Sequence, residues 1–270
     1  MSNMNDVSKT RRTVLASGTA GIATAVLCRT PALARVRKIF VFVHGAWHGG
    51  WCWRRVADLL EEKGHKVFTP TLTGLGERSH LLSTNVNLDT HIADIVNLIK
   101  WEDLRDISLV AHSYGGWPGS GAIEQTFDRI SSIVWVDAHK PEDGQRAVDF
   151  APEFSRRTLL ETVARGEAGR PAPKAEVFLV NERDRAWIDS KTTPQPNGVS
   201  LQPIRLTGAR ERVPKKTYIR AVRYPQPALD KALAECKADK SWRTFQTSTT
   251  GHDVMIDAPE WLAKLLLQVS

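Results

Sequence analysis

Hydrophobic positions from Arg35 onward fall into two alternating patterns. The continuous apolar run in KIFVFVHG is typical of a strand buried on both faces of a sheet, and ISSIVWVDA is expected to be another buried strand. Segments such as LDTHIADIVNLIKW and APEWLAKLLLQV instead carry apolar residues at helical spacing. Alternating strands and helices predict an α/β fold with a mostly parallel sheet of about six strands and helices on both faces. The expected strands are residues 38–45, 66–72, 106–113, 130–138, 216–222 and 242–248.

The alternation is interrupted after Asp137 for some seventy residues. Prolines are frequent there, at positions 171, 173, 194, 196 and 203, and the periodicity returns at KTYIRAV. We interpret residues 140–212 as a cap inserted over the carboxyl edge of the sheet. The core then consists of residues 35–139 and 213–270, and the chain is long enough for a single sizeable core.

The first 34 residues have the plan of an export signal rather than of a folded domain. A charged start is followed by an apolar stretch from Val14 to Leu27 and by the small-residue end Ala32-Leu33-Ala34. Arg11-Arg12, just ahead of the apolar stretch, resembles the bacterial twin-arginine signal. We therefore expect a periplasmic or secreted protein without stable membrane association after cleavage. An uncleaved membrane anchor or a tail is the alternative.

The formal net charge of +7 does not by itself indicate a nucleic-acid partner, because three of these charges lie in residues 1–34. The densest basic run in the remainder is ARERVPKK, Ala209–Lys216. A solvated loop accounts for this run, since a phosphate track would need a longer stripe or interleaved aromatic residues. We expect no nucleic-acid binding.

Cysteine usage gives no sign of metal chemistry. No C-x-x-C or H-E-x-x-H spacing occurs, so neither a metal nor another cofactor is expected. Cys52 and Cys236 would remain after signal cleavage and could form one disulfide in an oxidising compartment. Cys52 stands among large apolar residues in GGWCW, which favours a buried free thiol.

Ser113 is the candidate nucleophile. It stands in LVAHSYGGW, between an expected strand and an expected helix, with the small residues Ala111 and Gly115 two positions to either side. This arrangement is typical of a nucleophile elbow, a sharp turn that holds a serine hydroxyl above the sheet. Large side chains at the two flanking positions would clash with the neighbouring strand and helix.

His252 is the candidate base that a serine nucleophile needs. It lies in TSTTGHDVMIDAPEWL, after the last expected strand, which places it at the same sheet edge as Ser113. The other histidines that we considered have contexts typical of loop-shaping, surface or packing residues: His44, His48, His65, His80, His91 and His112.

The loop HGAWHGGW, His44–Trp51, supplies a candidate oxyanion hole. Acyl transfer develops negative charge on the carbonyl oxygen, and preorganised backbone N–H groups stabilise that charge. We expect these donors to be the N–H groups of Ala46, in the glycine-rich loop, and of Tyr114, in the elbow. A simple tight turn would also explain the glycines.

These segments resemble the α/β-hydrolase family, and the resemblance covers nearly the whole mature chain. FVFVHGAWHGGWCWRRVADLLEEKGHKV is similar to the opening of plant methyl esterases and hydroxynitrile lyases. HGAWHGGWC, TPTLTGLGERSHL and AHSYGGW are more similar to bacterial esterases of the kind that hydrolyse carbendazim. The resemblance implies an α/β-hydrolase fold, the Ser113–His252 pair and oxyanion donors at Ala46 and Tyr114.

The acid of the triad is less clearly marked. The family's common pattern places it after the strand that we expect at KTYIRAV, where the first carboxylate is Asp230, within an expected helix. Some members, including many haloalkane dehalogenases, carry it after the strand that follows the nucleophile helix, which here ends at Asp137. We favour Asp137 over Asp230, and Asp253 and Glu142 are weaker candidates.

Together these features predict a serine hydrolase that cleaves a small apolar or aromatic ester, carbamate or amide through an acyl-enzyme, with Trp47 and Trp117 in the substrate pocket. A hydroxynitrile lyase is disfavoured, because plant lyases carry lysine and threonine where this chain has Asp253 and Gly45. A non-catalytic binding protein of this fold is a further alternative, although such proteins often lose the triad.

Overall fold

The computed structural model describes residues 37–270, so the expected signal in residues 1–34 lies outside the described part. A six-stranded, fully parallel sheet of order β2-β1-β3-β4-β7-β8 forms its centre. The α/β architecture with about six parallel strands, predicted from the hydrophobic pattern, is confirmed. The strands are β1 (Ile39–Val43), β2 (Lys66–Phe68), β3 (Ile107–His112), β4 (Ile130–Val136), β7 (Lys215–Ala221) and β8 (Trp242–Thr247).

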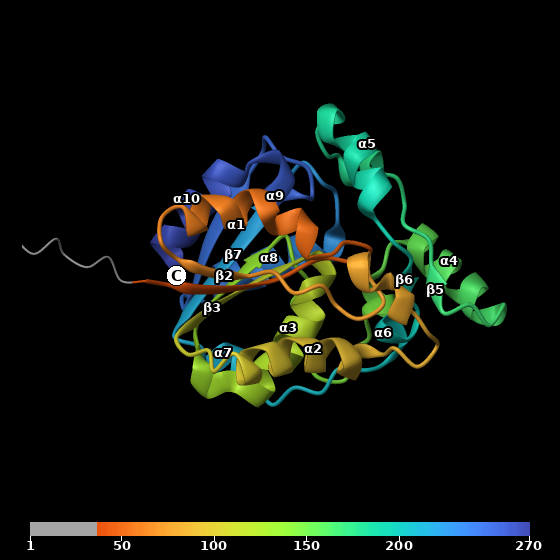
Figure 1. The fold of residues 1–270 in the computed structure, drawn as a ribbon, viewed down its shortest axis with the longest axis horizontal. Coiled ribbons are helices and arrows are strands. Elements are labelled where there is room, and N and C mark those ends of the chain that lie inside the picture. Colours follow the sequence, from red (N-terminus) through yellow and green to blue (C-terminus); the bar gives the residue numbers. More distant parts are fainter. Residues whose placement is uncertain (1–36) are drawn as a thin grey trace, which may run out of the picture. The chain divides into compact units, whose positions relative to one another are not determined.

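Helices cover both faces of this sheet (Figure 1). Helices α1 (Arg54–Glu61) and α10 (Pro259–Val269) pack together on one face, and α2 (Leu88–Trp101) and α3 (Gly116–Thr126) on the other. Helix α2 shows why the periodicity was informative, since Ile95 and Ile99 are fully buried. Burial of each such side chain stabilises the fold by roughly 1.5–3 kcal/mol. No helix among residues 37–270 has the length and apolar character needed to cross a membrane.

Between β4 and β7, the chain forms short elements to one side of the sheet (Figure 1). We call residues 140–212 the cap segment. Its strands β5 and β6 are two residues long and pair antiparallel, and proline follows or occupies each of them. Strands this short carry no readable periodicity, which contributes to the blurred hydrophobic pattern here. The elements are α4 (Glu153–Ala164), β5 (Gly169–Arg170), α5 (Glu182–Lys191), β6 (Gln195–Pro196), α6 (Gly198–Leu201) and α7 (Ala209–Arg212).

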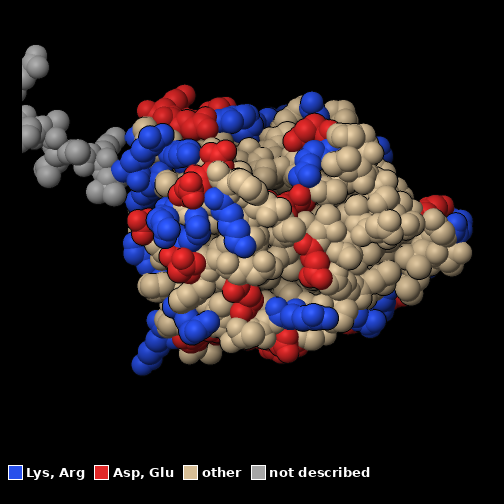
Figure 2. All heavy atoms as spheres, turned by 60° about the horizontal axis from the view of Figure 1, so that its bottom comes forward, with Lys and Arg blue, Asp and Glu red and all other residues tan. Residues whose placement is uncertain are grey.

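The basic run at Ala209–Lys216 is not the solvated loop that we expected. It forms α7 and the start of β7, and Arg210 and Lys216 are buried. The Lys216 ammonium donates to the carbonyl oxygens of Glu211 and Val213, at 2.8 and 3.0 Å. Arg210 likewise donates to the Ser120 hydroxyl and to the Pro141 carbonyl oxygen, so both side chains serve as hydrogen-bond donors inside the fold. On the face drawn in Figure 2, basic and acidic side chains are interspersed rather than arranged in a stripe of one sign.

The two cysteines in the described part are both buried and free. Cys52 precedes α1, and Cys236 lies in helix α8 (Pro227–Ala238), which packs on β7 and β8. No disulfide therefore joins them. Burial raises the pKa of the Cys236 thiol to about 12, which keeps it protonated and unreactive at neutral pH.

Candidate active site

Ser113 stands at a sharp turn between β3 and α3. Its φ is +52°, in the left-handed region that non-glycine residues rarely adopt. The turn brings the backbone against the loop after β1, so that a Cβ at Gly115 would lie 2.7 Å from the Val43 carbonyl oxygen and 2.8 Å from that of His44. Only glycine fits there. Backbone strain of about 1–3 kcal/mol at Ser113 is maintained by this packing and is typical of functional turns.

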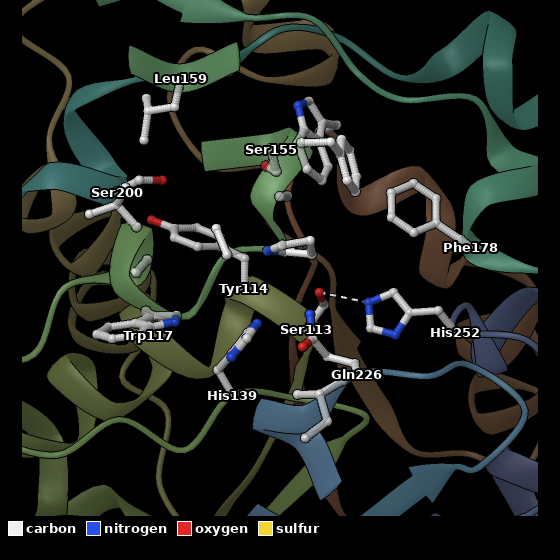
Figure 3. A pocket seen from close by; sticks show the side chains of 18 of the residues that line it. Ser113, Tyr114, Trp117, His139, Ser155, Leu159, Phe178, Ser200, Gln226 and His252 are labelled. Atoms are coloured by element: carbon white, nitrogen blue, oxygen red, sulfur yellow. Dashed lines mark hydrogen bonds between the residues drawn. The ribbon is translucent and has the colours of Figure 1, made fainter. Parts of the chain in front are cut away.

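The imidazole of His252 lies beside the Ser113 hydroxyl (Figure 3). His252 stands in the loop between β8 and α9 (Val254–Asp257), and its backbone N–H donates to the Phe178 carbonyl at 2.9 Å. The ring nitrogen Nε2 is 2.8 Å from Ser113 Oγ, and Nδ1 is 2.6 Å from Asp137 Oδ2. The fold thus brings a hydroxyl, an imidazole and a carboxylate into one hydrogen-bonded row.

Asp137 directly follows β4 with a φ of +45° and is fully buried. Its second oxygen, Oδ1, accepts from Arg220 Nη1 at 2.8 Å and from the Ala221 N–H at 2.9 Å. Both donors come from the neighbouring strand β7. Charge-assisted bonds of this kind fix the carboxylate and satisfy it, so that Oδ2 is left to hold the His252 ring.

Asp230 does not reach the histidine. It lies on α8 with 58% of its side chain exposed, and its Oδ1 accepts from Arg220 Nε at 2.9 Å. Asp253 is buried against His48, with 3.1 Å between Asp253 Oδ2 and His48 Nε2. Glu142 is exposed. None of these three carboxylates forms a hydrogen bond with the His252 ring, and only Asp137 does so among the described residues.

A second group of ionisable side chains lies behind His252. His112 Nε2 donates to the His252 carbonyl oxygen at 3.1 Å, and the two rings are 4.6 Å apart between centroids. Burial lowers the pKa of His112 far enough to keep its ring neutral. Burial opposes the charge of Asp253, but the facing His48 outweighs it and lowers the carboxyl pKa. Sequence reasoning placed His112 away from the nucleophile, and its ring indeed packs against His252 rather than Ser113.

Three other histidines, two of them fully buried, are held neutral. Burial lowers the pKa of His44 to about 3, and those of His91 and His139 to about 4. At His44, Nδ1–H donates to the Gly45 carbonyl at 2.8 Å, while Nε2 accepts from the Leu72 N–H at 3.0 Å. A proton on Nε2 would break the second bond.

We expect these histidines to make the fold sensitive to acid. Between pH 6.5 and about 4 the unfolded chain binds protons at these positions and the folded chain does not, so the free energy of unfolding falls as pH falls. Each group contributes up to about 1.36 kcal/mol per pH unit, so the loss from pH 6 to pH 5 is on the order of 3 kcal/mol. Urea unfolding at pH 7, 6 and 5 measures this. A midpoint that is unchanged or higher at pH 5 would contradict the expectation.

The expected oxyanion donors lie next to the nucleophile. Ala46 and Tyr114 both line the same pocket as Ser113. The loop approaches closely because Gly45 has no side chain: a Cβ there would be 2.8 Å from His112 Nδ1 and 3.0 Å from Ser113 Cβ. No hydrogen bond joins the Ala46 N–H to another group of residues 37–270, so this donor is free for a ligand.

The pocket over Ser113 is built from both the core and the cap segment (Figure 3). Trp47 and Trp117, expected there from the sequence, both line it. Trp187 of the cap segment does not, because its ring packs against Trp51 at 5.1 Å. Sequence reasoning missed several polar and aromatic lining residues, which no motif marks: His139, Ser155, Arg170, Ser200, Tyr224 and Gln226.

Among the missed residues, Tyr224 packs directly against the candidate base. Its ring stacks on the His252 imidazole, with 4.5 Å between centroids and 29° between planes. It follows β7 in RYPQPALD, a segment that we searched only for carboxylates. Among the described residues no cluster of three or more His, Cys, Asp or Glu side chains is arranged to hold a metal ion.

Comparisons with known proteins agree with this architecture. The model of the alpha/beta hydrolase family matches residues 40–265. A carbendazim hydrolyzing esterase from Nocardioides sp. is 37% identical over 237 residues, which cover 84% of this chain and 97% of the relative. A putative chloroplastic methylesterase 14 from Arabidopsis thaliana is 27% identical, covering 86% of this chain and 72% of the relative.

Solved structures show the same fold. An extracellular alpha/beta-hydrolase from a Paenibacillus species superimposes with a TM-score of 0.73 at 24% identity, covering 86% of this chain and 99% of that chain. A methylesterase from Arabidopsis has a TM-score of 0.65 at 22% identity, covering 86% and 98%. The chain belongs to the alpha/beta hydrolase family and is an esterase-type hydrolase of that fold.

Proposed function

We propose that the protein is a serine esterase in which Ser113 is the nucleophile, His252 the general base and Asp137 the acid that orients it. One observation carries this proposal. The hydroxyl, imidazole and carboxylate form a continuous row, with 2.8 Å from Ser113 Oγ to His252 Nε2 and 2.6 Å from His252 Nδ1 to Asp137 Oδ2. These distances suit proton transfer from the hydroxyl to the ring.

The reaction proceeds through an acyl-enzyme. Ser113 Oγ attacks the ester carbonyl carbon while His252 Nε2 takes its proton, and Asp137 stabilises the imidazolium that results. His252 then gives this proton to the leaving alkoxide, so that an alcohol departs. Water, deprotonated by His252, next attacks the acyl carbon, and Ser113 leaves with the proton restored to it. The carboxylic acid is the second product.

The N–H groups of Ala46 and Tyr114 stabilise the oxyanion in both tetrahedral intermediates. Their place beside Ser113 in the pocket supports this role. Tyr114 belongs to the turn that leads into α3, so its N–H group lies at the amino end of that helix. Loss of one such donor typically costs about 10²–10³-fold in turnover.

The preferred substrate is a small ester or carbamate with an apolar or aromatic group. Trp117, Leu159 and Phe178 give the pocket a largely apolar wall, which suits such a group. The relative that hydrolyses carbendazim is similar over most of this chain, which supports the carbamate option. A lyase is disfavoured because Asp253 stands after His252 and bonds to His48, where plant lyases carry a lysine.

A fluorophosphonate probe tests the nucleophile. We expect it to form one adduct per chain on the peptide that contains Ser113, and to abolish hydrolysis of p-nitrophenyl esters in parallel. Two other serines that line the pocket, Ser155 and Ser200, serve as internal controls in the same mass spectrum. An adduct on either of these, with Ser113 unmodified in the inactivated protein, would overturn the assignment.

We also propose that the protein is exported by the twin-arginine route, on the strength of Arg11-Arg12 and the apolar stretch after them. Changing both arginines to lysine should leave precursor in the cytoplasm and abolish the mature chain that begins at Arg35. Cell fractionation with N-terminal sequencing measures both. Normal export of the doubly changed protein would rule out this route.

A further inference from the structure

An arginine lines the pocket at some distance from the proposed nucleophile. Arg170, on β5 of the cap segment, is only 5% exposed, and its Nη2 donates to Ser200 Oγ at 3.1 Å. Figure 3 shows Ser200 and His252 on opposite sides of the pocket, with Ser113 beside His252. Arg170 therefore marks the end of the pocket that the proposed mechanism leaves unused.

The charge of Arg170 is not neutralised within residues 37–270. Its Nε and Nη1 are buried and have no hydrogen-bond partner, and no carboxylate pairs with it. Burial lowers its pKa to about 10, so that the guanidinium is still protonated at neutral pH. Buried charges in proteins are normally paired, because an unpaired one costs several kcal/mol. A group of opposite charge from outside the chain would complete this site.

The surroundings of Arg170 offer mainly donors. Gln195 stands opposite it in the β5–β6 pair, and its Oε1 accepts from the Trp47 N–H at 2.8 Å, which leaves the buried Nε2 without an acceptor. The Trp47 ring lies 5.3 Å from the Arg170 guanidinium carbon, and its own Nε1–H is also unpartnered. Tyr114 interacts electrostatically with Arg170, but its neutral hydroxyl does not neutralise a charge.

Ser200 completes the arrangement. Because its oxygen accepts from Arg170, its hydroxyl hydrogen remains available to a second acceptor. Nη2 has a second N–H besides the one that Ser200 accepts, and with the unpartnered Nη1 it forms an edge that matches the two oxygens of a carboxylate. The free hydroxyl hydrogen of Ser200 lies next to this edge. An apolar group would leave all of these donors unsatisfied.

We propose that Arg170 and Ser200, with Trp47 beside them, form a carboxylate subsite, and that the substrate is an ester carrying a carboxylate at the end remote from the scissile bond. The proposal rests on the proposed esterase function and deepens it, since Ser113 takes the ester carbonyl while Arg170 takes the remote anion. The apolar wall between the two ends then accommodates the chain that joins them. Half-esters of dicarboxylic acids are the simplest compounds of this class.

Hydrolysis of matched esters tests the subsite. The probes are monomethyl esters of unbranched dicarboxylic acids from succinate to suberate, together with the neutral half-amide methyl esters of the same lengths. We expect kcat/KM of the wild-type protein to favour the best anionic ester by at least about 10-fold over its amide. Arg170→Met should lower kcat/KM for the anionic ester by about 100-fold, which is about 2.7 kcal/mol, and reduce that for the amide much less.

Control variants separate the charge from the fold. Arg170→Lys keeps a cation and should retain part of the preference for the anionic ester. Arg157→Met, at an exposed position of α4 where Arg157 faces only Glu161, should leave the preference as in the wild type. Equal kcat/KM values for the anionic ester and its amide in the wild-type protein, or an unchanged ratio in Arg170→Met, would overturn the subsite.

A binding measurement distinguishes failure of the subsite from failure of the esterase proposal. Calorimetric titration of Ser113→Ala with the anionic half-ester measures binding without turnover. We expect binding that is about 100-fold weaker when Arg170→Met is added to this variant. Binding that depends on Arg170 in a protein that hydrolyses no ester would support the subsite and reject the proposed reaction. Hydrolysis of neutral esters without any binding of the carboxylate would support the proposed reaction and reject the subsite.

Discussion

Ser113→Ala is expected to lower kcat for a p-nitrophenyl ester by about 10⁶-fold, the size of loss known for the nucleophile of a serine triad. The substitution removes the only atom that bonds to His252 Nε2 among the described residues, so the ring has no hydroxyl to deprotonate. Steady-state kinetics of both proteins give the ratio of their kcat values, and active-site titration of the wild-type protein gives the concentration of active enzyme that this ratio requires. The residual rate should still exceed that in water by about 10³-fold, because the oxyanion donors and the pocket remain.

The fold should survive this change. Alanine at the positive φ of Ser113 is strained to about the same degree as serine, and within residues 37–270 the hydroxyl bonds to no group other than the His252 ring. Ser155→Ala provides a matched control, since Ser155 lines the same pocket without touching His252. We expect it to retain turnover within about 10-fold, as changes of pocket packing typically cost about 1 kcal/mol. Activity of Ser113→Ala comparable to that of Ser155→Ala would refute the nucleophile assignment.

The sheet could be predicted because its strands are buried on both faces. Positions 133–136, in the second half of β4, form a continuous apolar run, and the structure buries all of them. Short runs of this kind, rich in β-branched residues and alternating with helical segments, favour buried strands. The elbow could be predicted for a related reason. Close approach of three backbone segments at Gly45, Gly115 and Gly116 requires glycine, and this requirement is visible as a sequence pattern.

The electrostatic partners of the site could not be predicted in the same way. Arg220 lies on β7 and reaches Asp137, directly after β4, because the two strands are neighbours in the sheet, although 83 residues separate Arg220 from Asp137. Nothing in the local pattern around Arg220 distinguishes it from a surface arginine. The contacts of Arg170 depend likewise on the pairing of β5 with β6, and two-residue strands leave no periodic signal.

His139 illustrates a third limit. Its backbone N–H donates to the Ser113 carbonyl oxygen at 3.0 Å. Its own carbonyl oxygen would be only 1.9 Å from a Cβ at Gly116, so that position must be glycine. The residue therefore packs directly under the elbow and lines the pocket. In the sequence it follows a strand without any motif of its own, so only the three-dimensional register of β3 and β4 shows its place.

Asp137→Asn is expected to lower kcat by about 10⁴-fold, or roughly 5 kcal/mol, without unfolding the protein. The asparagine oxygen must keep the position of Oδ1, because it accepts there from Arg220 and from the Ala221 N–H. Its NH₂ group then faces His252 Nδ1. This forces the imidazole into the tautomer that carries its hydrogen on Nε2, and such a ring cannot accept a proton from Ser113.

Asp230→Asn is the matched control, because it removes a carboxylate bound to the same arginine. Asp230 is more than half exposed, and Arg220 retains Asp137 and the carbonyl oxygens of Ala221 and Tyr224 as acceptors. We expect kcat within about 3-fold of the wild type and a change in unfolding free energy within about 0.5 kcal/mol. Steady-state kinetics and urea unfolding of the two variants decide between the carboxylates. A crippled Asp230→Asn beside an active Asp137→Asn would transfer the role of the acid to Asp230, while the Ser113–His252 pair would keep its place in the mechanism.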